Sequence, residues 1–206
     1  MLKTKLVLGV LLFEGFELLD VCGPLEIFGR ASEHFEIKLV SELSGDVKSA
    51  QSVKLVTDHS FSDDENYDML LIPGGVGTRV LVNSEATLTW LKNNTPKAQL
   101  VASVCTGSAL LAKANLLDNK KATTNKAAFM WVTEQSNKVE WIKQARWVED
   151  GKFFSSSGVS AGMDMSLAII SKLLGEEEAN SIATFIEYEW HKDSSWDPFS
   201  KIYGLS

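Results

Sequence analysis

Cysteine is scarce in this chain. Only Cys22 and Cys105 occur among 206 residues, too few for the disulfide framework with which small secreted proteins supplement a thin core. No apolar stretch approaches the roughly 20 residues that a membrane-spanning helix needs. The apolar run Leu6–Phe13 follows two lysines as in a signal peptide, but acidic residues come after it in place of a cleavage site. These absences predict a cytoplasmic protein.

Basic residues are too few to balance the acidic ones. Lys and Arg total 20 against 27 Asp and Glu, which gives a net charge of −7 at pH 7. Such a surface repels nucleic-acid phosphates and anionic lipid headgroups, so we expect neither nucleic acid nor membrane as a partner. Because chains usually divide only beyond roughly 250 residues, residues 1–206 are expected to form a single domain.

Motifs for common cofactors are also missing. No phosphate-binding G-x-x-x-x-G-K-[ST] occurs, and Gly75-Val76-Gly77 lacks the third small residue of a dinucleotide-binding turn. The three histidines and two cysteines are too widely spaced to offer a close pair of metal ligands. We therefore expect no cofactor and no metal ion.

Buried strands alternate with helices along the chain. Short apolar segments without alternation are typical of strands covered on both faces of a parallel sheet. Their alternation with helical segments predicts an α/β fold with a mainly parallel central sheet. We expect strands at Lys5–Phe13, Phe35–Val40, Asp68–Ile72 and Leu100–Val104, and a hairpin about Asp150-Gly151 that joins Gln144–Glu149 to Lys152–Ser156.

Three helices have clear signals. Glu85–Asn94 reads as a modest helix, and Ser160 is expected to cap another that ends at Gly175. Acidic residues from Glu176 suit the positive end of the last helix. The apolar face expected of the Ser160 helix consists of Met163, Leu167, Ile170 and Leu174.

Cys105 stands where a buried strand turns directly into a helix. Ser103 and Gly107 are small, as a sharp strand-turn-helix elbow requires. At the start of a helix the pKa of a thiol falls below its usual value of about 8.5, which makes the thiolate a nucleophile. The alternative is a buried structural cysteine. The small neighbours favour a catalytic nucleophile.

Other candidate residues are expected at the same sheet edge, because ligands gather at the carboxyl ends of parallel strands. The turn Pro73-Gly74-Gly75 follows one buried strand, and Gly74 is a candidate for the substrate pocket. The backbone N–H groups of Thr106 and Gly75 are candidate donors to an oxyanion. The alternative for the glycines is an ordinary tight turn.

An acid is expected to work beside the cysteine. Asp20, in the loop after the first strand, has apolar neighbours that would raise its pKa and suit it to proton transfer. Capping of the next helix is its alternative, and Glu26 is another candidate acid. His34 and His59 lie in polar stretches and are expected to be solvated. His191, near the end of the last expected helix, is a pocket candidate or a cation at the helix terminus.

Together these segments resemble the ThiJ/PfpI superfamily of class I glutamine amidotransferase-like proteins, particularly its isonitrile hydratase-like branch. The motifs are D-V-C-G-P-L-E-I-F from Asp20, L-I-P-G-G-V-G-T from Leu71, S-V-C-T-G-S-A-L-L-A from Ser103, A-T-T-N from Ala122 and S-S-S-G-V-S-A-G-M-D from Ser155. The resemblance implies a flavodoxin-like three-layer α/β/α sandwich and a homodimer. It also implies Cys105 as nucleophile, Asp20 as its acid partner, and the Thr106 and Gly75 amides as oxyanion donors.

The resemblance also implies a reaction. In the isonitrile hydratase branch, a thiolate attacks the terminal carbon of R–N≡C, an acid moves protons, and water completes an N-substituted formamide without a cofactor. Many relatives have histidine after A-T-T, whereas this chain has Asn125, which can hydrogen-bond in the pocket but cannot act as a base. The leading interpretation is a cofactor-independent cysteine hydratase or hydrolase acting on a small molecule. The alternatives are a redox or stress sensor through Cys105 oxidation, and glyoxalase-like, deglycase-like or amidase activity.

Overall fold

A seven-stranded, mostly parallel sheet forms the centre of the structure, a computed structural model that describes residues 5–205. Its strands are β1 (Leu6–Leu11), β2 (Phe35–Ser41), β5 (His59–Ser60), β6 (Met69–Ile72), β7 (Leu100–Ser103), β10 (Trp147–Asp150) and β11 (Phe153–Ser156). They lie in the order β10-β11-β7-β6-β1-β2-β5, and only the β10–β11 pair is antiparallel. The predicted parallel sheet and the Asp150-Gly151 hairpin are confirmed.

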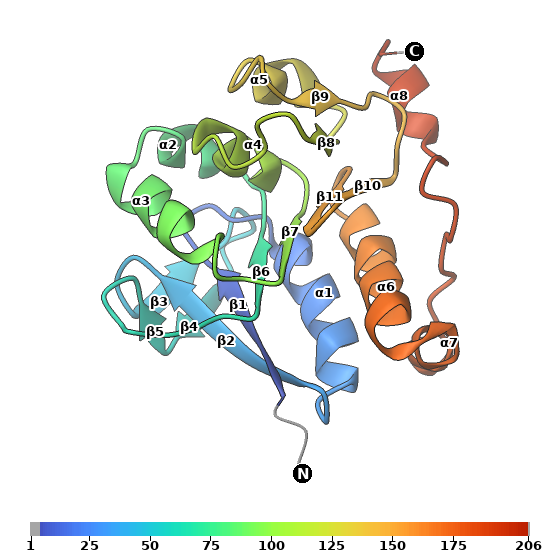
Figure 1. Ribbon diagram of the computed structural model, residues 1–206, viewed down its shortest axis with the longest axis horizontal. Helices are drawn as coiled ribbons and strands as arrows, with labels where there is room; N and C mark the ends of the chain where they lie inside the picture. The colour runs from blue at the N-terminus through green and yellow to red at the C-terminus, as the bar shows by residue number, and fades with distance from the viewer. Residues whose placement is uncertain (1–4, 206) are drawn as a thin grey trace.

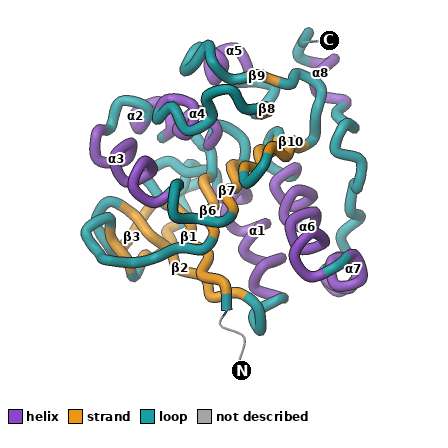
Figure 2. Tube along the Cα trace, viewed as in Figure 1, coloured by secondary structure: helices purple, strands orange, loops and turns teal. Residues whose placement is uncertain are grey.

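Helices cover both faces of this sheet. One face carries α1 (Leu18–Arg30), α6 (Ala161–Leu174) and α7 (Glu176–Phe185), and the other carries α2 (Thr78–Leu81), α3 (Glu85–Asn94) and α4 (Gly107–Lys113). Figure 2 shows the strands as a layer between these two groups of helices. Every residue of β6 and β7 is buried between them. The predicted flavodoxin-like three-layer α/β/α sandwich is confirmed.

Smaller elements extend the edges of the sandwich. The antiparallel pair β3 (Gly45–Lys48) and β4 (Lys54–Thr57) lies on the β2 side. The parallel pair β8 (Lys121–Ala122) and β9 (Glu140–Trp141) lies near the hairpin. The short helix α5 (Phe129–Thr133) lies between these two strands in the sequence. None of the helices in residues 5–205 is both long enough and apolar enough to cross a membrane.

The C-terminal end differs from the sequence prediction. The helix that begins at Glu176 is not the last one, because α8 (Pro198–Ile202) follows it. Residues 186–197 run from α7 past α6 to α8 (Figure 1), whose Phe199 lines a pocket together with residues 125–127. The side chain of Asp197 accepts a hydrogen bond from the Phe199 backbone N–H, and Pro198 occupies the first turn. Both are helix-start signals that can be read in the sequence.

A second difference concerns Asp20. The helix α1 begins at Leu18 with Glu17 as its N-cap, so Asp20 lies in the first turn of a helix and not in a loop. Its alternative role as the N-cap is therefore wrong. The structural consequence is a fixed direction for the side chain, which is completely buried.

Candidate active site

Cys105 occupies a strained elbow between β7 and α4. Its φ angle is +56°, a left-handed conformation that a residue with a side chain adopts at an energetic cost. The Cys105 backbone N–H donates to the Ser157 carbonyl at 3.0 Å, and the Thr124 hydroxyl donates to the Cys105 carbonyl at 2.8 Å. A side chain at Gly107 would place a Cβ 2.1 Å from the Ile72 carbonyl oxygen, so the elbow requires glycine there.

The Asp20 carboxyl group reaches the same point from α1. Its Oδ2 accepts a hydrogen bond from the Gly74 backbone N–H at 2.8 Å. Its Oδ1 has no hydrogen-bonding nitrogen or oxygen partner within residues 5–205, and the Cys105 side chain faces the carboxyl group. Burial raises the pKa of Asp20 to about 8, and the charge of Glu17 adds to this while the Gly74 N–H opposes it. The carboxyl group is therefore mainly protonated at neutral pH, as an acid catalyst must be.

The Cys105 thiol is also protonated at rest. Cys105 is only 6% exposed. Burial is the main cause, and the charge of Asp20 the second, of the rise in the pKa of the thiol to about 12. The prediction of a lowered pKa is wrong, because desolvation and the neighbouring acid outweigh the start of a seven-residue helix. The resting pair thus holds two protons.

Three polar groups near the Cys105 sulfur lower the pKa of its thiol. They are the backbone N–H groups of Thr106 and Val159 and the side chain of Asn125, and each stabilises the thiolate form. Val159 was missed by the sequence analysis, although the S-S-S-G-V-S-A-G-M-D segment that contains it was singled out. Its φ of +27° belongs to the loop between β11 and α6.

Asn125 is held in the orientation that presents its amide nitrogen. Its Oδ1 accepts from the Ala128 backbone N–H at 3.0 Å. The Nδ2 atom lies toward Gly158, where an added Cβ would be 2.7 Å away. Because the acceptor end is occupied, the donor end is the one available to the sulfur. The structure therefore brings this predicted pocket residue to Cys105.

The glycine turn packs directly on the cysteine. A Cβ at Gly74 would lie 2.5 Å from the Thr106 nitrogen and 2.9 Å from the Cys105 Cβ, so only glycine fits. The Gly75 N–H donates to the Thr106 hydroxyl at 3.0 Å. Its service as an oxyanion donor stays a prediction, and it requires that hydroxyl to turn away.

His191 lies elsewhere. Its backbone N–H donates to Asp164 Oδ1 at 2.9 Å, and its ring stacks on Trp196 with centroids 4.4 Å apart. The chain beyond α7 carries it past α6, because that helix ends at Phe185. It does not line the pocket beside Cys105.

Other titratable residues stay outside the site. Glu26 is exposed on α1, which leaves Asp20 as the buried acid of that helix. Cys22 is partly exposed, and burial raises the pKa of its thiol. Within residues 5–205, no three His, Cys, Asp or Glu side chains converge as a metal site would require.

A pocket of about 200 Å³ lies near the cysteine, although Cys105 itself does not line it. Asn125 and Val159, which both face the sulfur, form one wall of it together with Gly158. Phe199 and Tyr203, from α8 and the residue after it, form part of the rest. A small molecule in this pocket would thus contact Asn125 and Val159, the two lining residues that also lie close to the thiol.

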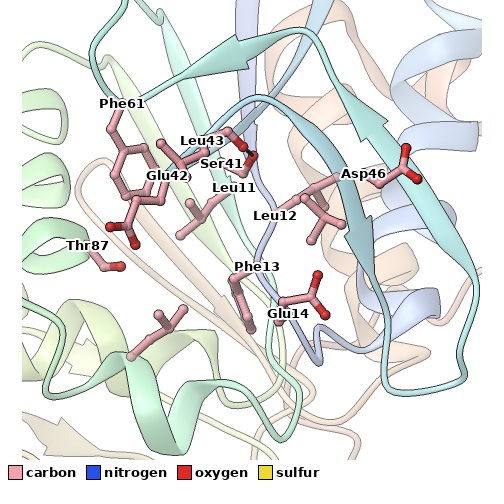
Figure 3. Close-up of a pocket in the computed structure, with 12 residues that line it drawn as sticks. Leu11, Leu12, Phe13, Glu14, Ser41, Glu42, Leu43, Asp46, Phe61 and Thr87 are labelled. Carbon is pink, nitrogen blue, oxygen red and sulfur yellow. Dashed lines mark hydrogen bonds between the residues drawn. The ribbon is translucent and has the colours of Figure 1, made fainter.

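A larger pocket, of about 460 Å³, lies at the end of β1 and β2 (Figure 3). Apolar side chains such as Leu11, Phe13 and Phe61 line it, with Glu14 and Glu42 among them. Neither Cys105 nor any residue that faces its sulfur contributes to this pocket. Size alone therefore does not locate the chemistry in this protein.

Comparison with known proteins shows the family of this chain. A sequence model of the DJ-1/PfpI family matches residues 7–172. The chain belongs to the DJ-1/PfpI family. It is 32% identical to an isonitrile hydratase from Pseudomonas putida over 89% of this chain and 78% of that protein. It is 27% identical to Protein DJ-1 homolog A from Arabidopsis thaliana, over 89% of this chain but only 46% of that protein.

Solved structures of DJ-1/PfpI proteins share the fold. A THiJ/PfpI family protein from Pseudomonas syringae superimposes with a TM-score of 0.80 at 26% identity, covering 91% of this chain and 77% of that one. DJ-1beta from Drosophila melanogaster also gives a TM-score of 0.80, at 20% identity, covering 91% of this chain and 100% of that one. The predicted resemblance to the ThiJ/PfpI superfamily is confirmed.

Proposed function

We propose that this DJ-1/PfpI protein hydrates a small isonitrile, R–N≡C, to the N-substituted formamide R–NH–CHO, with Cys105 as nucleophile and Asp20 as proton carrier. The observation that supports it most is that the buried Asp20 carboxyl group and the Cys105 side chain both pack against Gly74 at the elbow. The 32% identity to an isonitrile hydratase supports the choice of reaction.

The first half of the reaction adds the thiol to the isonitrile carbon. As the sulfur–carbon bond forms, the thiol proton passes to Asp20 and the Asp20 proton passes to the carbon. The product is a thioimidate, Cys–S–CH=N–R, and Asp20 is again protonated. No net charge is created in the buried site, which suits a pair in which both groups resist ionisation.

The second half uses water. The water oxygen bonds to the thioimidate carbon and one proton reaches the nitrogen, which gives Cys–S–CH(OH)–NH–R. The carbon–sulfur bond then breaks, the hydroxyl proton returns to the sulfur through Asp20, and R–NH–CHO leaves. The donors from Thr106, Val159 and Asn125 stabilise negative charge on the departing sulfur.

The direct test is turnover of cyclohexyl isocyanide to N-cyclohexylformamide, with the product measured by mass spectrometry. Cys105→Ala is expected to abolish product, while Cys22→Ala, which changes the other thiol, leaves the rate unchanged. An unaltered rate in Cys105→Ala, or no formamide from the unmodified protein, contradicts the proposal. Lactate formation from methylglyoxal in a parallel assay would favour the glyoxalase-like alternative.

The redox-sensor alternative makes a different demand on the thiol. Peroxide oxidises the thiolate, and sensor cysteines are exposed and have low pKa values. Burial and a pKa of about 12 leave Cys105 little thiolate for peroxide to oxidise, whereas in the proposed addition Asp20 takes up the thiol proton as the sulfur–carbon bond forms. Rapid sulfinate formation under dilute peroxide, without isonitrile turnover, would reverse that preference.

The proposal includes a cytoplasmic homodimer with a small-molecule substrate. The homodimer rests on the resemblance to the superfamily. Sedimentation equilibrium tests it, with a particle of twice the chain mass expected and a particle of one chain mass as the contrary result.

A further inference from the structure

The C-terminal segment, residues 186–205, supplies part of the pocket beside Cys105. Phe199 and Tyr203 line it together with Asn125 and Val159. The match to the DJ-1/PfpI family model ends at residue 172, so these two aromatic side chains lie beyond the part of the chain that the family model describes. The reacting groups and this wall of the pocket thus belong to different parts of the sequence.

A buried ion pair anchors α8 at the pocket. Lys126 Nζ lies 3.1 Å from Asp197 Oδ2, and both side chains are only 1% exposed. Asp197 Oδ1 accepts from the Phe199 backbone N–H at 2.9 Å. Lys126 directly follows Asn125 in the chain. The same pair therefore fixes Phe199 and the loop that carries Asn125.

A second buried ion pair holds the segment before it reaches the pocket. Arg146 Nε donates to Asp164 Oδ2 at 2.6 Å. Asp164 Oδ1 accepts from the Tyr188 hydroxyl at 3.1 Å and from the His191 backbone N–H at 2.9 Å. The Arg146 backbone N–H donates to the Ser194 carbonyl at 2.7 Å. These contacts make the segment a fixed wall along α6 (Figure 1).

The pocket suits a compact, uncharged group. Its volume of about 200 Å³ is below the range of about 300 to 1,000 Å³ usual for drug-sized ligands. Lys126 is its one charged lining residue, and that ammonium is satisfied by Asp197, by the Thr123 hydroxyl at 2.7 Å and by the Ala145 carbonyl at 3.0 Å. No free charge within the lining therefore awaits an ionic partner.

We propose that this pocket binds the R group of the substrate, and that Phe199 and Tyr203 limit it to compact, uncharged, apolar substituents. The inference rests on the proposed function for the reacting group, whereas the position of the pocket against Asn125 and Val159, which lie close to the thiol, does not depend on it. Phe199 and Tyr203 act here as specificity residues, because they contact the part of the substrate that does not react.

Isonitriles of two sizes test the size limit. The unmodified protein is expected to turn over cyclohexyl isocyanide well and 2-naphthyl isocyanide poorly. Phe199→Ala and Tyr203→Ala should each raise the kcat/KM ratio of naphthyl to cyclohexyl substrate by about tenfold or more. The change should be mainly in KM, since the wall contacts ground state and transition state alike. Ile202→Ala is the matched control, because Ile202 is on α8, is 69% exposed and does not line the pocket.

Alkylation of Cys105 tests the same wall without hydration. In a Cys22→Ala background, the thiol adds across the double bond of N-methylmaleimide or N-(1-naphthyl)maleimide, with sulfur on one carbon and its proton on the other. Phe199→Ala and Tyr203→Ala should raise the rate ratio of the bulky to the small reagent, and Ile202→Ala should not.

The two assays separate the inference from the proposed function. A shifted maleimide ratio together with no isonitrile turnover in any variant refutes the hydratase and leaves the pocket assignment standing. In the other outcome, isonitriles are turned over, but Phe199→Ala and Tyr203→Ala give the same substrate ratio and the same maleimide ratio as Ile202→Ala. That outcome retains the hydratase and overturns the role of Phe199 and Tyr203.

Discussion

The Asp20 carboxyl group and the Cys105 thiol are both protonated at rest, and each residue alters the pKa of the other. The charge of Asp20 is the second cause of the raised pKa of Cys105, after burial, and the Cys105 side chain slightly lowers the pKa of Asp20. The Cys105 thiol and the Asp20 carboxyl group are therefore one unit whose protonation has to be measured as a pair.

Asp20→Asn separates the two effects. The amide has nearly the same shape but carries no acidic proton, so isonitrile turnover should fall by about 10² to 10⁴. Above about pH 8, where Asp20 ionises, the variant also lacks a negative charge beside the sulfur. Iodoacetamide should then alkylate Cys105 faster than in the unmodified protein. Slower alkylation in the variant would contradict the electrostatic account, as would undiminished turnover.

Asp20 also makes stability depend on pH. Its pKa is about 8 in the folded protein and about 3.9 in an unfolded chain. Below about pH 4 both states are protonated, and between these values the folded state keeps a proton that the unfolded state has released. Stability from this group therefore falls as pH rises, by up to about 1.4 kcal/mol per unit, until about pH 8.

Urea unfolding of the unmodified protein and Asp20→Asn between about pH 4 and pH 8 measures this effect. The difference in unfolding free energy between the two proteins should shift steadily in favour of the variant as pH rises. Parallel curves would show that Asp20 has the same pKa in both states.

At the scale of secondary structure, α8 depends on the Lys126–Asp197 pair. Asp197→Asn keeps the cap on the Phe199 N–H but leaves the buried Lys126 ammonium without a counter-charge. Breaking a buried pair in this way costs about 3 to 5 kcal/mol of unfolding free energy. The double variant Lys126→Met, Asp197→Asn should recover most of that loss, because no charge stays buried. Urea unfolding measures both, and a single variant as stable as the unmodified protein would contradict this account.

The central elements were predictable from the sequence, whereas the C-terminal segment was not. Burial on both faces leaves a continuous apolar run, which is why β6 and β7 were placed almost to the residue, and Glu85–Asn94 was placed with the observed bounds of α3. The position of residues 186–205 depends instead on Lys126–Asp197 and Arg146–Asp164, whose partners are far apart in the chain. Such pairs leave no periodic pattern to read.

The candidate site divides in the same way. Cys105, Asp20, Thr106, Gly74 and Gly75 follow from strand ends and small residues, and the structure brings them together. The direction of the thiol pKa was not predictable, because it depends on burial and on a carboxyl group from another helix. The Val159 donor and the α8 wall likewise come from loops that only the fold brings near the sulfur.

At the scale of the whole molecule, the net charge and the pocket lining both disfavour an anionic substrate. A net charge of −7 disfavours the approach of anions, and the pocket offers no free charge to a bound group. The proposed reacting groups, Cys105 and Asp20, lie within residues 7–172, whereas Phe199 and Tyr203 of the pocket lie outside that range. We expect relatives that share the elbow but not this segment to accept substrates of other sizes.

Rapid-quench mass spectrometry during turnover of cyclohexyl isocyanide tests the central claim most directly. The account predicts a transient adduct on the Cys105 peptide, heavier by one isonitrile molecule, that forms and decays at least as fast as N-cyclohexylformamide appears. Formation of the formamide with no adduct on Cys105, and at the same rate in Cys105→Ala, would contradict it.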